Sequence, residues 1–391
     1  MKTPLTFLLS LALLTPALRA AEPPPLRHVG NESVRNEVAT AIGKGLAYLK
    51  AQQQSDGSFR NPLTPAAEPE HPALTALPLI AFQRAPSPAD HAAVLEKGYT
   101  FLRSHVQPDG GIYLKGLSNY NTSVALMALL NTGEPKDEPI VIAARKFIGA
   151  QQASEMVKPE TNGGFGYGPT GSSPKRQHPD LDNTLVTLEA IRAFAKARPG
   201  TELAGSKDLN WKAAIGFISR TQNLTATNQS EWASDDAQNK GGFIYYPGFS
   251  NAGETELPGG KKALRSYGSM TYAGLLSFIY AEVKKDDPRV AAALEWLQKN
   301  YTLEENPGLG RQGLYYYYHL AAKGLASAGV REFTTPEGKQ VDWARDLALK
   351  LINLQTGDGS WVNDTARWME KDPVLVTTYC VLTLEIVHHQ L

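Results

Sequence analysis

The stretch KGLAYLKAQQQSDGSF at residues 44–59 occurs again, in the same register, as KGYTFLRSHVQPDGGI at residues 97–112. In each copy a segment with apolar residues at helical spacing is followed by an Asp-Gly turn and an apolar residue. Self-similarity of this kind is the sequence signature of a repeat protein. The stretch therefore predicts a helical hairpin that is repeated along the chain.

Four further copies continue this register. Each copy is identified by an apolar anchor residue and by the residue four positions later. With the first two copies included, the pairs are Leu49/Gln53, Leu102/Val106, Ile148/Gln152, Ile218/Gln222, Leu297/Tyr301 and Leu351/Gln355. Polar, glycine-rich insertions of varying length separate the copies, as is typical of surface loops. The chain thus contains six hairpin units.

The two segments of each unit differ in polarity. The first is amphipathic and is expected to lie on the surface with one apolar face inward. The second is apolar nearly all round, which requires burial, and runs over residues 75–82, 122–130, 184–194, 271–280, 315–325 and 377–387. Six outer helices around six buried inner helices predict an all-α (α/α)6 toroid, a single domain over residues 36–391 with a central cavity.

The amino terminus has the pattern of a targeting segment. A basic residue, an apolar run and small residues before a cut after Ala20 predict a signal peptide at residues 1–20. A proline-rich linker is expected at residues 21–35. We therefore expect an exported protein in the periplasm or outside the cell, with no membrane-spanning segment in the mature chain.

Charge and cysteine content exclude several function classes. The 39 basic and 39 acidic residues are interspersed, so the chain lacks the basic patches that bind nucleic acid or anionic membranes. Its one cysteine, Cys380, excludes an intrachain disulfide and a cysteine-rich metal site. We expect no nucleic-acid partner and no cofactor, and the oligomeric state stays open.

The repeat resembles the QW repeat of squalene-hopene cyclases and protein prenyltransferase β subunits. The resemblance rests on the Lys-Gly, aromatic-Leu, Gln and Gly-x-aromatic positions of residues 44–59 and, in part, of residues 351–361. It implies the same toroid, in a secreted version with one ring. The Gln amide is expected to satisfy unpaired carbonyls at an outer helix end, and the Gly to permit the positive φ of the turn.

Zinc-dependent prenyl transfer is not expected from this resemblance. The metal-binding His of the zinc enzymes would fall on Val376, and their Asp-x-Cys near residues 269–271, which offer neither carboxylate nor thiolate. Cys380 lies within an apolar segment and is read as a small buried hydrophobe. No metal site is therefore predicted.

The squalene-hopene cyclases begin an inner helix with Asp-x-Asp-Asp-Thr, and this chain has DLDNT at residues 180–184. The resemblance implies that Asp182 is a proton donor to an alkene, with Asp180 as its neighbour and Asn183 in place of the last Asp. His178 is placed to hydrogen-bond one of the two acids. The alternative is that these residues only cap the helix, since Asp and Asn are preferred at that position.

Aromatic residues of the inner helices are the candidates for the cavity wall, because ring faces stabilise positive charge. The candidate substrate-binding residues are Asn183, Tyr120, Tyr267, Tyr272, Tyr315, Tyr318, His319 and Tyr379. Helical spacing predicts that Tyr315, Tyr318 and His319 lie on one face.

Three functions are open at this point. The first is a terpene cyclase-like enzyme that binds and processes an isoprenoid or another hydrophobic molecule by acid catalysis from Asp182. The second is a toroid that binds a ligand or a protein without catalysis. The third is a polysaccharide-acting enzyme, for which Asp180/Asp182 and Asp235/Asp236 are the compact carboxylate pairs.

Overall fold

The computed structural model describes residues 31–62, 71–154, 159–168 and 178–391. The expected signal peptide, residues 1–20, lies outside the described residues, as does most of the expected linker at 21–35. The first helix already begins at Glu32, so the helical domain starts before residue 36. No proline follows residue 25 in this region, and an acidic residue in the first turn suits the helix dipole.

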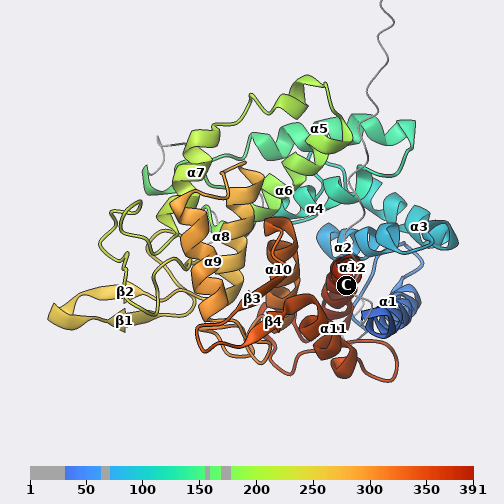
Figure 1. The fold of residues 1–391 in the computed structure, drawn as a ribbon. Helices are drawn as coiled ribbons and strands as arrows, with labels where there is room; N and C mark the ends of the chain where they lie inside the picture. Colours follow the sequence, from blue (N-terminus) through green and yellow to red (C-terminus); the bar gives the residue numbers. More distant parts are fainter. Residues whose placement is uncertain (1–30, 63–70, 155–158, 169–177) are drawn as a thin grey trace, which may run out of the picture.

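The described residues form twelve α-helices in six hairpins (Figure 1). The outer helices are α1 (Glu32–Gln52), α3 (Ala92–Arg103), α5 (Glu138–Gly149), α7 (Trp211–Arg220), α9 (Pro288–Lys299) and α11 (Trp343–Leu354). The inner helices are α2 (Pro72–Arg84), α4 (Ser118–Leu129), α6 (Leu181–Ala197), α8 (Gly268–Tyr280), α10 (Leu314–Ala328) and α12 (Pro373–Gln390). Each inner helix contains one of the apolar segments predicted from the sequence.

The inner helices form a closed ring. Each contacts the next in the order α2, α4, α6, α8, α10 and α12, and α12 returns to α2. Every outer helix packs on the inner ring, and α1 also contacts α11 across the junction between the first and last hairpins. The fold is the all-α (α/α)6 toroid that the sequence predicts.

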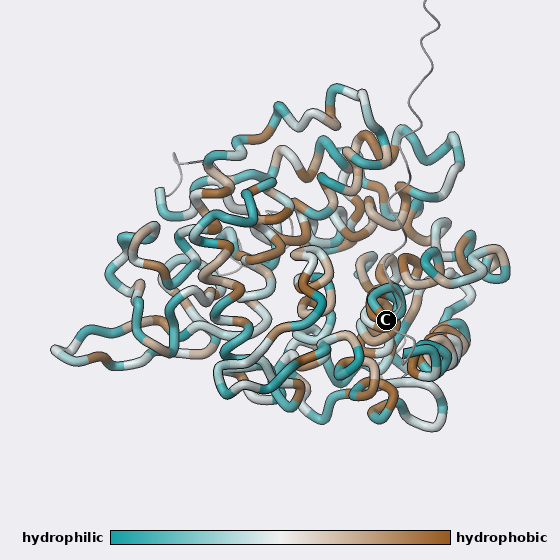
Figure 2. The backbone as a smooth tube through the Cα atoms, viewed as in Figure 1, coloured by the Kyte–Doolittle hydropathy of each residue, from teal (hydrophilic) through white to brown (hydrophobic). Residues whose placement is uncertain are grey.

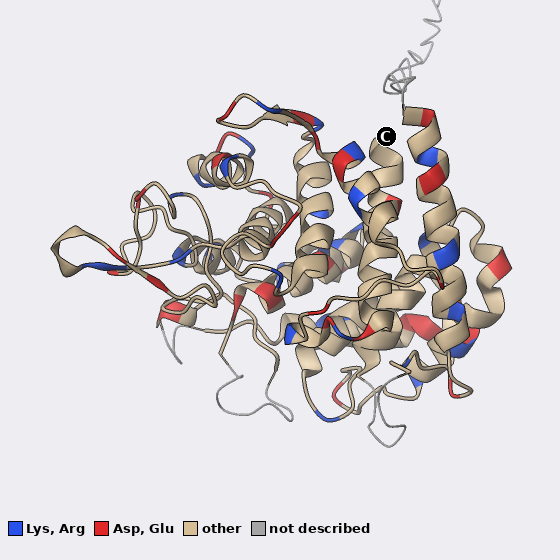
Figure 3. Cartoon of the chain, turned by 90° about the horizontal axis from the view of Figure 1, so that it is seen from below, with Lys and Arg blue, Asp and Glu red and all other residues tan. Residues whose placement is uncertain are grey.

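Hydropathy follows this architecture. Hydrophobic residues concentrate on the inner helices and on the inward faces of the outer ones (Figure 2), which together make one continuous core. Basic and acidic residues are interspersed over the face seen from below (Figure 3). None of the helices within the described ranges is long and apolar enough to cross a membrane.

A threonine near the start of an inner helix fixes the preceding turn in five of the six hairpins. Its Oγ1 accepts the backbone N–H of the apolar residue that ends the turn, in the pairs Thr75–Phe59, Thr122–Ile112, Thr184–Phe165, Thr271–Phe243 and Thr377–Trp361. A buried N–H needs such a partner. The bond therefore joins each turn to the inner ring.

Four hairpins also share one glutamine contact. The side-chain amide donates to a glycine carbonyl of its own turn and to a carbonyl of a neighbouring outer helix, from Gln53 to Gly57 and Val94, Gln152 to Gly163 and Asn210, Gln222 to Gly241 and Arg289, and Gln355 to Gly359 and Ala41. The first three of these neighbouring carbonyls lie at or near the start of an outer helix, whereas Ala41 lies in the middle of α1. The last of these contacts reaches α1 and closes the ring.

The insertions carry the remaining regular structure. Strand β1 (Glu254–Glu256) pairs antiparallel with β2 (Lys262–Leu264) before α8, and β3 (Glu332–Thr334) pairs with β4 (Gln340–Asp342) before α11. Both hairpins lie outside the ring (Figure 1). They leave the inner helices free to enclose the cavity.

Replacing Gly163 with Ala is expected to lower the free energy of unfolding by about 3 kcal/mol or more. Gly163 has φ +91°, and a Cβ there would come within 2.0 Å of the Ala213 backbone in α7. Chemical denaturation measures the change. Gly43→Ala is the matched control, because Gly43 is an exposed position within α1 where a Cβ meets nothing within 4 Å, so this variant is expected to gain about 1 kcal/mol. Equal effects of the two substitutions would contradict the prediction.

Candidate functional site

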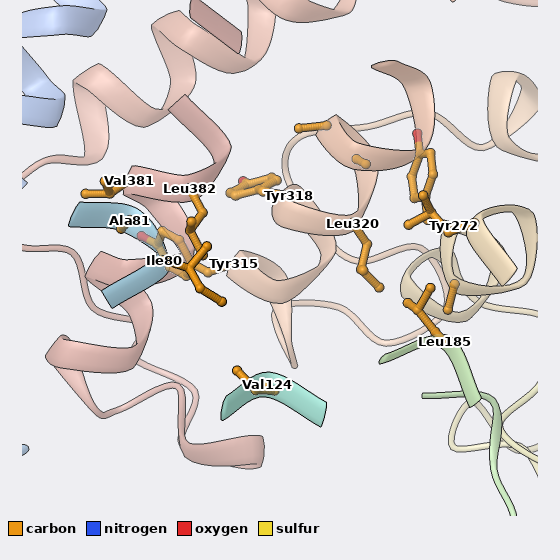
Figure 4. Packing of buried hydrophobic residues seen from close by; sticks show 14 of the residues in the cluster. Ile80, Ala81, Val124, Leu185, Tyr272, Tyr315, Tyr318, Leu320, Val381 and Leu382 are labelled. Atoms are coloured by element: carbon orange, nitrogen blue, oxygen red, sulfur yellow. The ribbon is translucent and has the colours of Figure 1, made fainter. Parts of the chain in front are cut away.

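A cavity of about 770 Å³ lies inside the ring. It is lined by residues of α2, α4, α6, α10 and α12 and of the segment around the start of α3. About half of these residues are aliphatic, and Figure 4 shows five of them, from five inner helices, around one space: Ile80, Val124, Leu185, Leu320 and Leu382. The charged side chains of Arg84, Glu96, Glu189, Lys196 and Lys323 also line the cavity. The aliphatic part of the wall suits an apolar ligand.

One end of the cavity is aromatic. Tyr120, Tyr316 and Tyr379, near the starts of α4, α10 and α12, line it together with His319. The rings of Tyr316 and Tyr379 lie 5.5 Å apart, and His319 stacks on Tyr379 at 5.8 Å. The Tyr120 and Tyr379 hydroxyls are hydrogen-bonded to each other. Ring faces therefore surround a ligand at this end.

Asp182 lies directly behind this aromatic wall. It is in the first turn of α6, and its Oδ1 accepts a hydrogen bond from the Tyr316 hydroxyl in the first turn of α10. Asp182 is not itself a lining residue, so Tyr316 stands between the carboxyl group and the cavity. Burial raises the pKa of Asp182, while the Tyr316 hydrogen bond and the charge of Lys323 act in the opposite direction.

Asp180 caps the same helix. Its Oδ1 accepts the Asn183 backbone N–H and its Oδ2 accepts the Asn183 side-chain amide, both at 2.8 Å. The residue is fully buried, and burial together with the charge of Asp182 raises its pKa to about 8. Both oxygens of Asp180 are thus used as acceptors, which is the arrangement of a capping carboxylate.

The two acids therefore bind a proton at a higher pH than ordinary carboxyl groups do, because burial disfavours two neighbouring negative charges. Two observations bear on which acid carries that proton, and they point to different residues. The pKa of Asp180 is raised to about 8. Both Asp180 oxygens accept N–H groups, however, whereas Oδ2 of Asp182 accepts no hydrogen bond from the described part of the chain, which makes Asp182 the candidate proton donor.

A second pair of polar residues bridges the same two helices further along. Glu189 and Lys323 lie seven residues beyond Asp182 and Tyr316, and Lys323 Nζ donates to Glu189 Oε2 at 2.5 Å. Both side chains line the cavity. The α6–α10 pair is therefore connected twice across the ring, once at the aromatic end and once in the aliphatic part.

Tyr316 is held in place from outside the ring by Glu370. The Glu370 carboxylate accepts the Tyr316 backbone N–H at 2.8 Å and the Asn363 side-chain amide at 2.6 Å, and the residue is only 1% exposed. The two residues before it, Trp368 and Met369, both have positive φ. Two consecutive non-glycine residues in this conformation are strained, as is common where a backbone must deliver one functional group.

Solved structures with similar architecture belong to two kinds of protein. The type II terpene cyclase MstE from Scytonema, in complex with geranylgeranyl dihydroxybenzoate, is 14% identical with TM-score 0.56, covering 92% of this chain and 99% of that one. The α-1,6-mannanase GH76A of Salegentibacter sp. HEL1_6 is 11% identical with TM-score 0.56, covering 91% and 100%. No protein-family model and no curated protein matches the chain.

This chain shares their fold. At such low identity the likeness extends to the architecture alone, and the terpene cyclase and the mannanase show that one toroid can serve an isoprenoid or a polysaccharide. The choice between them rests on the residues of this cavity.

Three of the predicted cavity residues, Tyr120, His319 and Tyr379, line the cavity. The four other tyrosines predicted to line the cavity do not line it. The Tyr267 hydroxyl accepts from the Asn251 amide, and Tyr272 packs on Tyr317. Tyr315 packs on Tyr318, whose hydroxyl donates to the Leu303 carbonyl. Asn183 is also not a lining residue, because its amide is bonded to Asp180. The physical reason is helical phase, since the cavity face of α10 contains Tyr316 and His319 rather than Tyr315 and Tyr318.

The remaining candidates lie outside the lining as well. His178 stacks on Tyr246 at 4.0 Å, and its Nδ1 is 3.4 Å from the Pro179 carbonyl. Asp235 accepts two hydrogen bonds from Thr225, and Asp236 accepts from Gln238 and Asn239. The Asp235/Asp236 pair therefore holds its own loop together, and neither this pair nor Asp180/Asp182 belongs to the cavity wall, whose carboxylates among the described residues are those of Glu96 and Glu189.

The sequence interpretation missed Tyr316, Glu189, Lys323 and Glu370. Glu189 and Lys323 could have been identified from the sequence, because they are charged residues within the apolar inner segments 184–194 and 315–325. A charge in such a segment needs a partner or a function. No sequence pattern identifies Glu370, since it lies in an irregular loop far from α10 in the sequence.

Proposed function

We propose that this chain is an exported terpene cyclase-like enzyme that binds an alkene of isoprenoid character in its cavity and protonates it from Asp182. The observation that carries the proposal is the Asp182–Tyr316 hydrogen bond at the aromatic end of a cavity whose wall is about half aliphatic. Burial raises the pKa of this acid, and the Tyr316 ring separates it from the cavity until a ligand binds.

The chemistry follows from the two oxygens of one carboxyl group. Oδ2 of Asp182 gives its proton to a carbon of the double bond, which leaves a carbocation on the neighbouring carbon and a carboxylate on Asp182. Tyr316 donates to Oδ1 and so stabilises that carboxylate, and Lys323 adds a favourable charge. The carbocation is attacked by another double bond of the same molecule, which forms a ring, and loss of a proton completes an isomerisation.

The aromatic residues have a separate part in this proposal. A cation near Tyr120, Tyr316 and Tyr379 faces their electron-rich rings. Each ring stabilises the cation by about 0.5–2 kcal/mol. For Tyr316 to expose Asp182, its ring must rotate away from the carboxyl when the ligand binds. A bound alkene that fills the aromatic end supplies the contacts for that rearrangement.

Binding without catalysis is the second candidate function. It is favoured by the position of Tyr316 between Asp182 and the cavity, and by the capping hydrogen bonds of Asp180. In that case the carboxyl groups hold α6 and α10 in place, and the cavity only carries its ligand.

Incubation in D₂O tests the proposal. The purified mature chain is expected to convert squalene or a linear C20 polyprene to a cyclic isomer that carries one deuterium on carbon, because the first step transfers a deuteron from Asp182. Mass spectrometry of the extracted lipids measures this. Saturable binding of the same molecules with no cyclic isomer and no deuterium uptake would favour the binding function instead.

A further inference from the structure

The ion pair in the aliphatic part of the cavity is unusual for a site that holds only hydrocarbon. Glu189 and Lys323 are 17% and 14% exposed, and that remaining exposure faces the cavity they line. A hydrocarbon that covers the pair removes the last water from both charges without replacing a hydrogen bond. Such desolvation of a charged pair is costly.

A second polar group beside the pair lacks a partner. His319 is 7% exposed, lines the same cavity one turn before Lys323, and its buried Nδ1 has no hydrogen-bond partner among the described residues. Burial and the charges of Lys323 and Arg84 hold the pKa of His319 well below its usual range, so the ring is neutral. A buried polar atom without a partner is unfavourable, so a rotation of the ring that turns this nitrogen toward the cavity would let a ligand group satisfy it.

We propose that Glu189, Lys323 and His319 form a subsite for a hydroxyl group on an otherwise apolar ligand. Glu189 and Lys323 cancel each other in charge, so the pair itself favours a neutral group, and Glu189 repels a phosphate or a carboxylate. Arg84 and Lys196, which also line the cavity, are the cations that an anionic group would use instead. A hydroxyl accepts from Lys323 Nζ and donates to a Glu189 oxygen or to a ring nitrogen of His319. It is the smallest neutral group that satisfies a donor and an acceptor together.

The position of the subsite predicts the distance between the hydroxyl and the reacting double bond of the ligand. Glu189 and Lys323 lie seven residues beyond Asp182 and Tyr316 on the same helices, and a rise of ~1.5 Å per residue separates the two levels by about 10 Å. Because the inference rests on the proposed function, the substrate is an unsaturated terpenoid alcohol. Its hydroxyl lies about 10 Å from the double bond that Asp182 protonates.

Binding to the Asp182→Asn chain tests this without turnover. The probes are geranylgeraniol, the same chain with hydrogen in place of the hydroxyl, and geranylgeranyl diphosphate, measured by titration in identical detergent. The alcohol is expected to bind at least about tenfold tighter than either of the others, because hydrogen bonds to charged groups contribute about 1.5–3 kcal/mol.

The double variant Glu189→Gln/Lys323→Met, in the same background, removes both charges without leaving one buried alone. It is expected to lose the preference for the alcohol and to bind the hydrocarbon at least as well as before. Lys212→Met, an exposed lysine of α7, is the matched control and is expected to keep the preference. Thermal unfolding shows that each variant is folded.

Three results would overturn the subsite: equal binding of hydrocarbon and alcohol, tightest binding of the diphosphate, or an unchanged preference in the double variant. None of these bears on acid catalysis, which the deuterium experiment measures separately. Conversely, an absence of cyclic product with a retained preference for the alcohol would reject the cyclase proposal and leave a hydroxyl-binding cavity.

Discussion

Asp182→Asn is expected to lower the rate of alkene cyclisation about 10³-fold at unchanged ligand affinity. The substitution keeps the size of the side chain and an oxygen that accepts from the Tyr316 hydroxyl, so the contact between α6 and α10 persists. The amide has no acidic proton to give, and general acid catalysis typically contributes 10²–10⁴-fold. Single-turnover product formation and a separate binding titration distinguish the two quantities.

Asp180→Asn is the matched control, because it places the same substitution two residues away on the same helix end. An asparagine still caps the helix through its oxygen, so α6 is expected to remain folded. If Asp182 carries the proton, the rate of this variant falls less than about tenfold. Loss of turnover in Asp180→Asn with normal turnover in Asp182→Asn would contradict the proposed mechanism and identify Asp180 as the proton donor.

The architecture followed from the sequence because the repeat is local. Five of the six units place an apolar anchor, a turn glycine and an inner-helix threonine within one hairpin, and the contacts that use them also lie within or next to that hairpin. Thr377 and Trp361 in the last unit repeat what Thr75 and Phe59 do in the first. Short-range patterns of this kind survive long insertions, so the ring could be predicted from one register.

The cavity wall could be predicted only in part, and the tyrosine run shows why. Residues 315–318 are four consecutive tyrosines, which cover a full helical turn, so each face of α10 carries one of them. Periodicity cannot decide which face is inward when all faces are alike. The inward face became visible only through the partner of Tyr316, Asp182, which lies two inner helices away in the ring.

Asn183 shows a related limit. In the sequence, Asn183 is a departure from the cyclase motif, which has Asp at this position. In the structure its side-chain amide donates a hydrogen bond to Asp180, which an aspartate carboxylate could not do. Asn at this position therefore lowers the pKa of Asp180 instead of adding a third negative charge, while burial and the charge of Asp182 still raise that pKa to about 8. The variants Asp180→Asn and Asp182→Asn test which of the two acids gives the proton.

Glu370→Ala is expected to lower the free energy of unfolding by about 3 kcal/mol, since it removes the cap of α10. Gly313, at the N-cap position, has no side chain that replaces the carboxylate, and the Tyr316 N–H loses its acceptor in a buried position. The Asn363 amide loses a partner as well. Denaturant titration of the variant and of the wild type measures the difference.

The same substitution has a second readout that a purely structural role does not predict. Tyr316 links the α10 backbone held by Glu370 to the carboxyl of Asp182, so Glu370→Ala is expected to reduce turnover in the fraction that remains folded, with ligand affinity less affected. Glu337→Ala, an exposed glutamate in the β3–β4 turn, is the control and is expected to change stability by less than about 0.5 kcal/mol. If the two variants are equally stable, the Tyr316 amide finds another partner, and the position of Tyr316 depends on packing within the ring.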